Sequence, residues 1–170
     1  MKREFKQQIV DLLNDHRIMT IATNRADGWP QATIVGYVND GLVIYFVIGR
    51  DSQKFANIAR DPRVSVAIGN DYPQFLQIEG LSMAGRVAEV QDRDEIEHVA
   101  DIMYQRYPEY KAVPRPDPAV VPVMRLTPEI VSILDYSQGF GHTDLVLVTD
   151  ADLAEHVESA QHRWANHRAA

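Results

Sequence analysis

The stretch "RDSQKFANIARDPRVSVAIG", residues 50–69, predicts two strands joined by one short helix. The apolar run "LVIYFVIG" ends just before it, and "RVSVAIG" within it alternates as a half-buried strand does. Between these runs, Asp51 or Ser52 is suited to begin a helix, because short oxygen-bearing side chains bond the free N–H groups of the first turn. The connection therefore places Arg50, Ser52 and Lys54 at the N-terminal end of a short helix, which we call the helix mouth.

The segments before this stretch predict hairpins. Turn signals at 27–28 and 39–41 separate the strand-like runs "IMTIAT", "QATIVGYV" and "LVIYFVIG". Three strands joined by short turns predict an antiparallel meander.

The segments after it predict further strands. "FLQIEGLSMAGRVAEV" predicts one long strand that bends near Gly80 or Gly85, since glycine in a strand often marks a bulge. Residues 119–137 predict one or two strands, broken at Pro128, and "LVLV" predicts a short strand after the loop "QGFGHTD".

Helical patterns cover residues 2–16, 92–110 and 149–168, and Asp92 and Glu95 have the spacing of a capping box. Hairpins dominate, and no regular alternation of strand and helix is present, which argues against a Rossmann sheet. The predicted fold is mainly β within the α+β class: an antiparallel barrel or sandwich with helices at its ends. We expect one domain over 1–170, with a C-terminal loop and helix at 136–170.

Composition limits the functional classes. The chain has 170 residues, of which 45% are hydrophobic, so a sizeable core can form. Its formal net charge of −7 argues against general binding to nucleic acid or an anionic membrane. The absence of cysteine excludes disulfides and thiol catalysis, and the scattered histidines predict no metal site. Without an apolar leader, the start predicts a soluble cytoplasmic protein with no membrane partner.

The helix mouth at Arg50, Ser52 and Lys54 has two interpretations. A helix N-terminus with a hydroxyl and an ammonium beside it is a good phosphate site. It is equally an ordinary N-cap with surface charges, and Asp51 would repel an anion. The neighbouring strands, rich in β-branched and aromatic residues, either offer backbone groups to the edge of a planar heterocycle or form plain core.

A second candidate is the loop that carries Tyr136, Phe140 and His142. Two glycines flank Phe140, and glycine lets a backbone approach a ligand closely. Tyr136 and His142 can donate hydrogen bonds or protons to a substrate. The alternative is a structural loop that closes the barrel. No P-loop, G-x-G-x-x-G or G-x-S-x-G motif is present.

Residues 19–69 carry a family resemblance. "TIATNRADGWPQATIVGYV", "GLVIYFVI" and "DSQKFANIARDPRVSVAIG", followed by "GRVAEV", resemble in order and spacing the FMN-binding split barrels of the pyridoxamine 5′-phosphate oxidase-like superfamily. "LTPEIVSILDYSQGFGHTDLV" is similar to the C-terminal strand and loop of some uncharacterised members.

The resemblance implies an FMN-dependent oxidoreductase that is a homodimer with two FMN sites at the subunit interface. It implies that Ser52 and Lys54 bind the FMN phosphate, with Arg50 as an extra cation, and that Tyr45 and Phe46 touch the cofactor. The full set of implied cofactor residues is Thr33, Ile34, Val35, Gly36, Tyr45, Phe46, Arg50, Ser52, Gln53, Lys54 and Gln77. Catalytic residues stay unknown, with Tyr136, Phe140 and His142 as candidates for the substrate side.

Departures from the family pattern leave the function open. The true oxidases have basic residues where this chain has Thr33, Val38 and Gln53, and "SAQHRWANHRAA" does not reproduce their substrate-binding C-terminus. Vitamin B6 oxidation is therefore not expected, and the substrate is an unidentified small molecule. The alternatives are a non-catalytic flavin-binding or stress-response protein, and a haem- or deazaflavin-binding relative.

Overall fold

The structure, a computed structural model, describes residues 1–115 and 117–157. Helices and 3-10 turns form at α1 (Arg3–Asp15), α2 (Gln53–Arg60), η1 (Phe75–Gln77), α3 (Arg93–Arg106), η2 (Pro108–Ala112), η3 (Tyr136–Gln138) and α4 (Asp150–Ala154). Strands form at β1 (Ile18–Asn24), β2 (Pro30–Gly36), β3 (Val38–Asp40), β4 (Val43–Val47), β5 (Arg63–Gly69), β6 (Glu79–Glu89), β7 (Val123–Asp135) and β8 (Thr143–Leu147).

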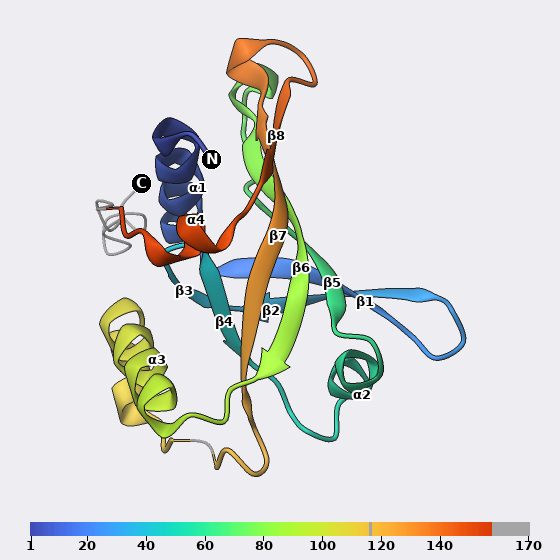
Figure 1. The fold of residues 1–170 in the computed structure, drawn as a ribbon, viewed down its shortest axis with the longest axis vertical. Coiled ribbons are helices and arrows are strands. Elements are labelled where there is room, and N and C mark those ends of the chain that lie inside the picture. The colour runs from blue at the N-terminus through green and yellow to red at the C-terminus, as the bar shows by residue number, and fades with distance from the viewer. Residues whose placement is uncertain (116, 158–170) are drawn as a thin grey trace.

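These strands form one curled antiparallel sheet in the order β2-β1-β5-β6-β7-β4-β3, with β8 also paired to β7 (Figure 1). The two ends of this order, β2 and β3, are consecutive in the chain. The sheet therefore curls almost into a barrel but leaves a split between β2 and β4. The predicted antiparallel split barrel with flanking helices is confirmed.

Strand register sorts the side chains into an inner and an outer face. One aligned row across six strands is turned inward, and most of its members are fully buried: Thr33, Ile21, Val66, Met83, Val131 and Val146. The adjacent row is turned outward and carries no charge: Ile34, Thr20, Ala67, Ser82, Ser132 and Leu145. Since successive side chains of a strand point to opposite faces, the period-2 pattern fixes this division.

The predicted meander is wrong in one respect. β1 and β2 form a hairpin, but β4 pairs with β7 and β3 rather than with β2. The chain bends at Tyr37, whose backbone N–H donates to the Arg17 carbonyl and whose hydroxyl donates to the Leu13 carbonyl. These two bonds carry β3 away from β1 and across to β4, and this bend opens the split.

Two predicted strand boundaries also differ. Phe75–Gln77 forms a 3-10 turn, so β6 begins only at Glu79. β7 runs unbroken through Pro128. The β6–β7 register is irregular next to Gly85, which pairs with Pro128, and at such an irregularity a strand tolerates proline, which has no backbone N–H to donate. The register shift confirms the irregularity predicted near Gly80 or Gly85, and a Cβ at Gly85 would collide with the Thr127 carbonyl.

The helix starts follow the predicted caps, but two helices are shorter than predicted: α3 ends at Arg106, ahead of Pro108, rather than at residue 110. Ser52 caps α2 by accepting a hydrogen bond from the Phe55 N–H, and Asp92 caps α3 in the same way. The helix expected over 149–168 ends at Ala154, and the rest of that prediction from residue 158 lies outside the described residues. No helix in the described ranges has both the length and the apolar composition to cross a membrane.

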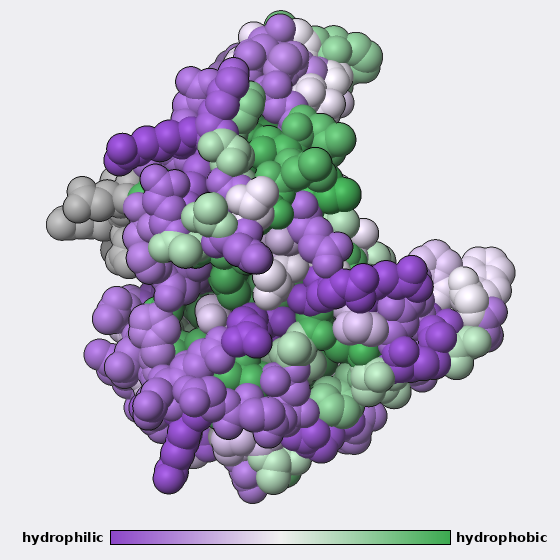
Figure 2. All heavy atoms as spheres, viewed as in Figure 1, coloured by the Kyte–Doolittle hydropathy of each residue, from purple (hydrophilic) through white to green (hydrophobic). Residues whose placement is uncertain are grey.

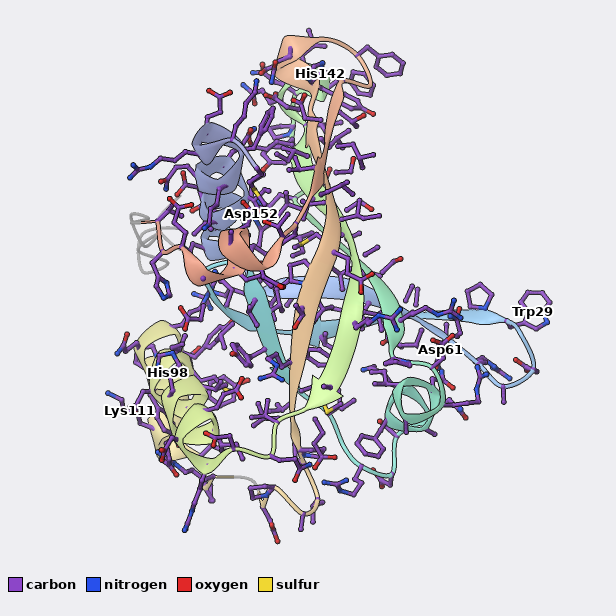
Figure 3. The ribbon with its side chains drawn as sticks, in the orientation of Figure 1. Trp29, Asp61, His98, Lys111, His142 and Asp152 are labelled. Carbon is purple, nitrogen blue, oxygen red and sulfur yellow. The ribbon has the colours of Figure 1, made fainter. Side chains whose placement is uncertain are left out.

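Two projections extend from the body of the sheet (Figures 1 and 3). The hairpin between β1 and β2, residues 24–31, ends in the exposed Trp29; we call it the Trp29 arm. The far ends of β6, β7 and β8, together with η1 and η3, form the second projection, which carries His142. We call its exposed cluster of Phe75, Leu76, Tyr136 and Phe140 the aromatic tip.

Candidate functional site

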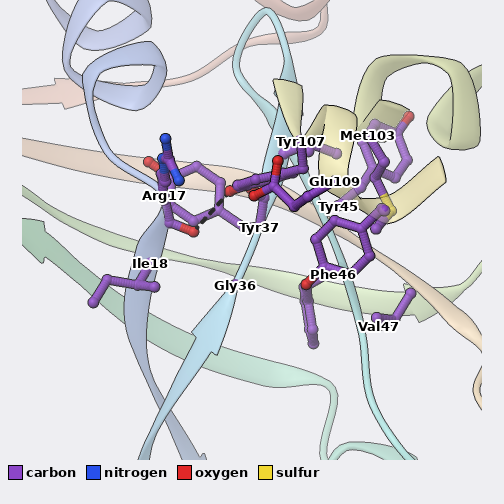
Figure 4. A pocket seen from close by; sticks show the side chains of 12 residues that line it. Arg17, Ile18, Gly36, Tyr37, Tyr45, Phe46, Val47, Met103, Tyr107 and Glu109 are labelled. Carbon is purple, nitrogen blue, oxygen red and sulfur yellow. Dashed lines mark hydrogen bonds between the residues drawn. The ribbon is translucent and has the colours of Figure 1, made fainter. Parts of the chain in front are cut away.

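A pocket of about 330 Å³ opens at one end of the split. Figure 4 shows side chains from β1, the bend before β3, β4 and the α3–η2 segment converging on it. Its lining residues are Arg17, Ile18, Gly36, Tyr37, Val38, Tyr45, Phe46, Val47, Met103, Tyr107, Glu109 and Tyr110. The volume is at the lower end of the range of small-molecule sites, roughly 300–1,000 Å³.

The wall that α3 and η2 supply is fastened to the sheet by buried hydrogen bonds. The Tyr107 hydroxyl lies 2.9 Å from the Tyr37 carbonyl and 3.1 Å from the Arg17 carbonyl, and shares its proton between them. Arg106 donates to the carbonyls of Leu13, Asn14 and His16 and to the Asn39 side chain. Burial lowers the pKa of Arg106, but these acceptors compensate for its desolvation. The wall is thus part of the folded body.

Tyr45 and Phe46 were expected to touch a cofactor together, and both line the pocket. They are adjacent on β4, so their rings lie on opposite faces: Phe46 packs in the main core and Tyr45 beneath α3. The Tyr45 hydroxyl donates to Glu95, whose two carboxylate oxygens accept from Arg125 at 2.9 Å. Burial raises the pKa of Tyr45, and the hydrogen bond to Glu95 raises it further, so this phenol remains protonated.

The split leaves two strand edges without partners in the described residues. β2 pairs only with β1, and β4 pairs with β3 only as far as Tyr45, so Phe46 and Val47 face the split unpaired. On the inner face of β2, the Thr33 hydroxyl is buried and has no hydrogen-bond partner among the described residues. Unpaired backbone groups and an unpaired buried hydroxyl together form a polar edge that suits the rim of a planar heterocycle.

The mouth of α2 lies farther along β2. Asn57 donates to both Thr23 and Gln31 at 3.0 Å, and its own oxygen accepts from Gln53, so α2 is fixed against β1 and β2. Ser52 serves as the helix cap. Lys54 is half-buried, burial lowers its pKa, and it has no ion-pair partner in the described part of the chain. A partly desolvated, unpaired ammonium at a helix N-terminus suits an anion.

Arg50, predicted as an extra cation at this mouth, has other partners. It forms a two-pronged ion pair with Glu89, donates to the carbonyls of Pro118 and Ala119, and lies over the Phe55 ring. Hydrogen bonds from Arg50 hold the pKa of Glu89 below its usual range. Arg50 therefore anchors the 117–120 turn to the sheet, and it can reach a ligand only by leaving Glu89.

The remaining predicted residues fall into two groups. Thr33, Ile34, Val35 and Gly36 follow one another along β2, and Gly36 lines the pocket. Gln77 and the proposed substrate-side residues Tyr136, Phe140 and His142 belong to the second projection instead, and none of them lines this pocket. His142 bonds Asp144 at 3.1 Å. Their predicted role at a cofactor cleft is not tested by the fold of one chain.

Sequence analysis missed the α3–η2 contribution to the site. Tyr107 and Tyr110 line the pocket, yet the sequence pattern around them predicted only an amphipathic helix. The one available signal was the density of tyrosines in "MYQRYPEY", ahead of a proline-rich segment. Arg17 was missed because it lies in a connection between helix and strand.

Comparisons with known proteins agree with this architecture. The family model described as pyridoxamine 5′-phosphate oxidase matches residues 5–134. General stress protein 26 of Bacillus subtilis (strain 168) is 26% identical over 96 residues, which are 54% of this chain and 68% of that protein.

Two solved structures show the same fold. A heme binding protein from Mycobacterium smegmatis superimposes with a TM-score of 0.72 at 19% identity, over 86% of this chain but only 59% of its own. HutZ, the heme storage protein of Vibrio cholerae, gives a TM-score of 0.61 at 20% identity, over 72% of this chain and 88% of its own. With its curled antiparallel sheet and a family match over most of its length, the chain belongs to the pyridoxamine 5′-phosphate oxidase-like family of split barrels.

Proposed function

We propose that this protein binds FMN in the split and acts as an FMN-dependent oxidoreductase on an unidentified small molecule. The observation that carries the proposal is the pair of unpaired strand edges, β2 and the end of β4, that face each other beside the pocket. The edge of an isoalloxazine ring alternates hydrogen-bond donors and acceptors, which matches the backbone groups of a free strand edge.

The spacing of the two parts of the site supports this. Gln31, which α2 contacts through Asn57, and Gly36, which lines the pocket, are five residues apart on β2. At the rise of a strand, roughly 3.3 Å per residue, this separates the pocket from the Asn57 contact, in the second turn of α2, by about 17 Å. An extended flavin mononucleotide has a comparable length, so its phosphate would lie near Ser52 and Lys54 when its ring lies in the pocket.

The residues of the chain would position and enclose the cofactor. When bound, FMN supplies the hydride and electron transfer chemistry. Lys54 and the N–H groups of α2 would hold the phosphate, and the β2 edge and Thr33 would orient the ring. Tyr37, Tyr107 and Tyr110 would exclude water from one side of it. Their phenols are either bonded to carbonyls or at the pocket rim, so no protein nucleophile is required.

We also propose the homodimer that the family resemblance implies. The outward row of the sheet, from Ile34 to Leu145, is uncharged across six strands in a chain of which 24% is charged. Ile34 is 69% exposed and Leu145 is 73% exposed. Depletion of charge on an exposed surface is typical of the centre of an interface, so this row supports association.

Haem binding is the second candidate. Two relatives of the same fold are described as heme-binding and heme-storage proteins. The pocket lining of this chain includes Met103 and several tyrosines, side chains that can ligate haem iron. The phenols of Tyr45 and Tyr107 are already engaged in hydrogen bonds, which favours the flavin over the haem.

The absorption spectrum of the purified chain, as isolated and after incubation with FMN, haem or a deazaflavin, separates these candidates. We expect the two visible flavin bands, shifted from those of free FMN because the ring leaves water. A Soret band that forms with haem while FMN stays unbound would overturn the proposal. A flavin that binds but is not reduced by any donor would leave the non-catalytic, stress-protein-like alternative.

Lys54→Ala tests the orientation of the cofactor. A charge-assisted hydrogen bond to phosphate contributes about 1.5–3 kcal/mol, so FMN affinity should fall roughly ten- to a hundred-fold while riboflavin affinity stays unchanged. Fluorescence titration of the apoprotein with both ligands measures this. Lys2→Ala, which changes an exposed lysine at the N-cap of α1, is the matched control. Equal losses for FMN and riboflavin would remove Lys54 from the phosphate site.

A further inference from the structure

The aromatic tip presents apolar surface on an ordered support. Phe75, Tyr136 and Phe140 contact one another with ring centroids 5.4–5.5 Å apart. The Asp135 carboxylate fixes η3 by accepting bonds from Ser137 and Gln138. Yet Phe75 remains 58% exposed and Phe140 76% exposed. Large aromatic side chains held in this way without cover mark an interaction surface.

The Trp29 arm shows the same property at the other end of the molecule. Trp29 is 72% exposed at the end of the hairpin (Figure 3). Bonds within the turn hold its shape: Asp27 accepts from the Trp29 N–H and from Arg25, and Gly28 has the positive φ that the turn requires. Tryptophan is the residue type most enriched among interface hot spots.

The two projections flank the outward face of the sheet. Viewed down the shortest axis of the molecule, they extend in different directions from the sheet and give the protomer an L shape (Figure 1). Figure 2 shows a hydrophobic area in the angle between them, over β8. Its exposed side chains include Ile130, Leu145 and Leu147.

Charge differs between the projections in a complementary way. The tip segments, residues 70–79 and 131–147, contain four carboxylates and neither Lys nor Arg. The base of the arm, residues 24–31 and 60–63, contains three arginines against two aspartates. Arg63, although paired with Asp61, keeps a side chain that is 67% exposed. The arm with its adjoining residues 60–63 therefore has a formal charge of +1 where the tip segments have −4, and surfaces of opposite charge attract each other.

We propose that the aromatic tip of one protomer receives the Trp29 arm of a second copy of this chain. Two L-shaped bodies related by a two-fold axis in the open angle bring each tip against the other's arm, and both contacts form at once. The uncharged rows then face each other in the middle. The proposal rests on the homodimer proposed above but is independent of the cofactor, and it gives Phe140 and Trp29 a role in assembly.

Sedimentation equilibrium of single and double variants tests the contact. Trp29→Ala and Phe140→Asp should each raise the dimer dissociation constant roughly 10- to 100-fold, as expected for interface hot spots. If the two side chains contact each other, the dissociation constant of the double variant should rise by less than the product of the two single increases. Val120→Asp, which changes a valine that is 59% exposed outside both projections, should leave the dissociation constant unchanged.

Trp29 itself reports the contact. In a background carrying Trp164→Phe, Trp29 is the sole tryptophan, since the chain has two. Its emission should shift to the blue and resist acrylamide quenching at concentrations where the dimer forms, and both effects should be lost on dilution or with Phe140→Asp. Affinity should also fall as salt rises, because opposite charges meet.

Some outcomes overturn the proposal. A protein that remains monomeric at tens of micromolar would do so, and so would a dimer in which Trp29 stays fully quenchable or Trp29→Ala has no effect. FMN titration of the same samples distinguishes failure of the arm–tip contact from failure of the proposed FMN binding. Flavin binding without the arm–tip contact refutes only the contact, and a Trp29-dependent dimer that binds no flavin refutes only the cofactor.

Discussion

The protein has two aromatic clusters, and they differ in how far their rings are buried and whether their polar groups are hydrogen-bonded. In the pocket wall, Tyr37 is 2% exposed and Tyr107 is 8% exposed, and both hydroxyls donate to buried carbonyls of the same chain. At the aromatic tip, Phe75 and Phe140 are mostly exposed and stack on each other. The first cluster is complete within one protomer. The second leaves its apolar surface to water.

This difference distinguishes a site from an interaction surface. The pocket wall contributes to stability, because its tyrosines and Arg106 connect α1, the Tyr37 bend and α3 by buried hydrogen bonds. The tip contributes little to the fold of its own chain, since removing its exposed rings uncovers no core. Substitutions in the two regions should therefore differ in their effect on the free energy of unfolding, and three experiments test this difference.

The largest effect is expected for Arg106→Met. It would remove the guanidinium hydrogen bonds to the carbonyls of Asn14 and His16 and one of the two donors to the Leu13 carbonyl, at a cost of about 3–5 kcal/mol, or a drop of roughly 10 °C in Tm. Arg86→Met, which breaks only an exposed pair with Glu129, should cost about 0–1 kcal/mol. Thermal unfolding followed by circular dichroism measures both. Equal effects of the two substitutions would contradict the structural role assigned to Arg106.

An intermediate effect is expected for Tyr107→Phe, compared with the same substitution at Tyr136. Loss of the Tyr107 hydroxyl removes the side-chain donor to the buried Tyr37 carbonyl and should cost about 1–3 kcal/mol. The Tyr136 hydroxyl has no hydrogen-bond partner among the described residues, so Tyr136→Phe should change the free energy of unfolding by less than about 0.5 kcal/mol. Urea denaturation of both variants gives the difference. A Tyr136→Phe loss that matched Tyr107→Phe would show that the tip is integral to the fold.

The smallest effect is the pH dependence of the tip. Hydrogen bonds from Ser137 and Gln138 hold the pKa of Asp135 below its usual value near 3.8. A depressed folded-state pKa means that the stabilisation is fully present above the unfolded-state value and is lost as the pH falls through the lowered one. Asp135→Ala should therefore cost under about 1 kcal/mol at neutral pH and nothing in strong acid. A difference from the wild type that persists in strong acid would exclude this cause.

Local patterns predicted much of this fold. The capping residues Ser52 and Asp92, the bulge at Gly85 and the alternation along β5 each depend on neighbouring residues only, and each is confirmed. The features that were wrongly predicted from the sequence depend on contacts with residues far away in the chain. The break before β3 requires Tyr37 to bond residues of α1 and of the connection before β1, and β7 continues through Pro128 because its partner β6 carries the compensating bulge.

The candidate site divides in the same way. The residues along β2 and at the α2 mouth were found in the sequence because each belongs to one continuous motif. Arg50 belongs to that motif too, but its preference for Glu89 was not visible, since Glu89 is contributed by β6. Tyr107 and Tyr110 were not found at all, because an apolar helical pattern does not reveal which strand the helix covers.

The sequence by itself determined the fold class, the inward and outward faces of the strands and the caps of α2 and α3, because hydrophobic periodicity and capping act over a few residues. The tertiary structure alone decided where the sheet splits, which side chains meet around the pocket, and which aromatic residues remain exposed. Those outcomes depend on contacts between residues far apart in the chain, such as Tyr107 with Tyr37 and Arg106 with Leu13, and no local pattern encodes such pairs.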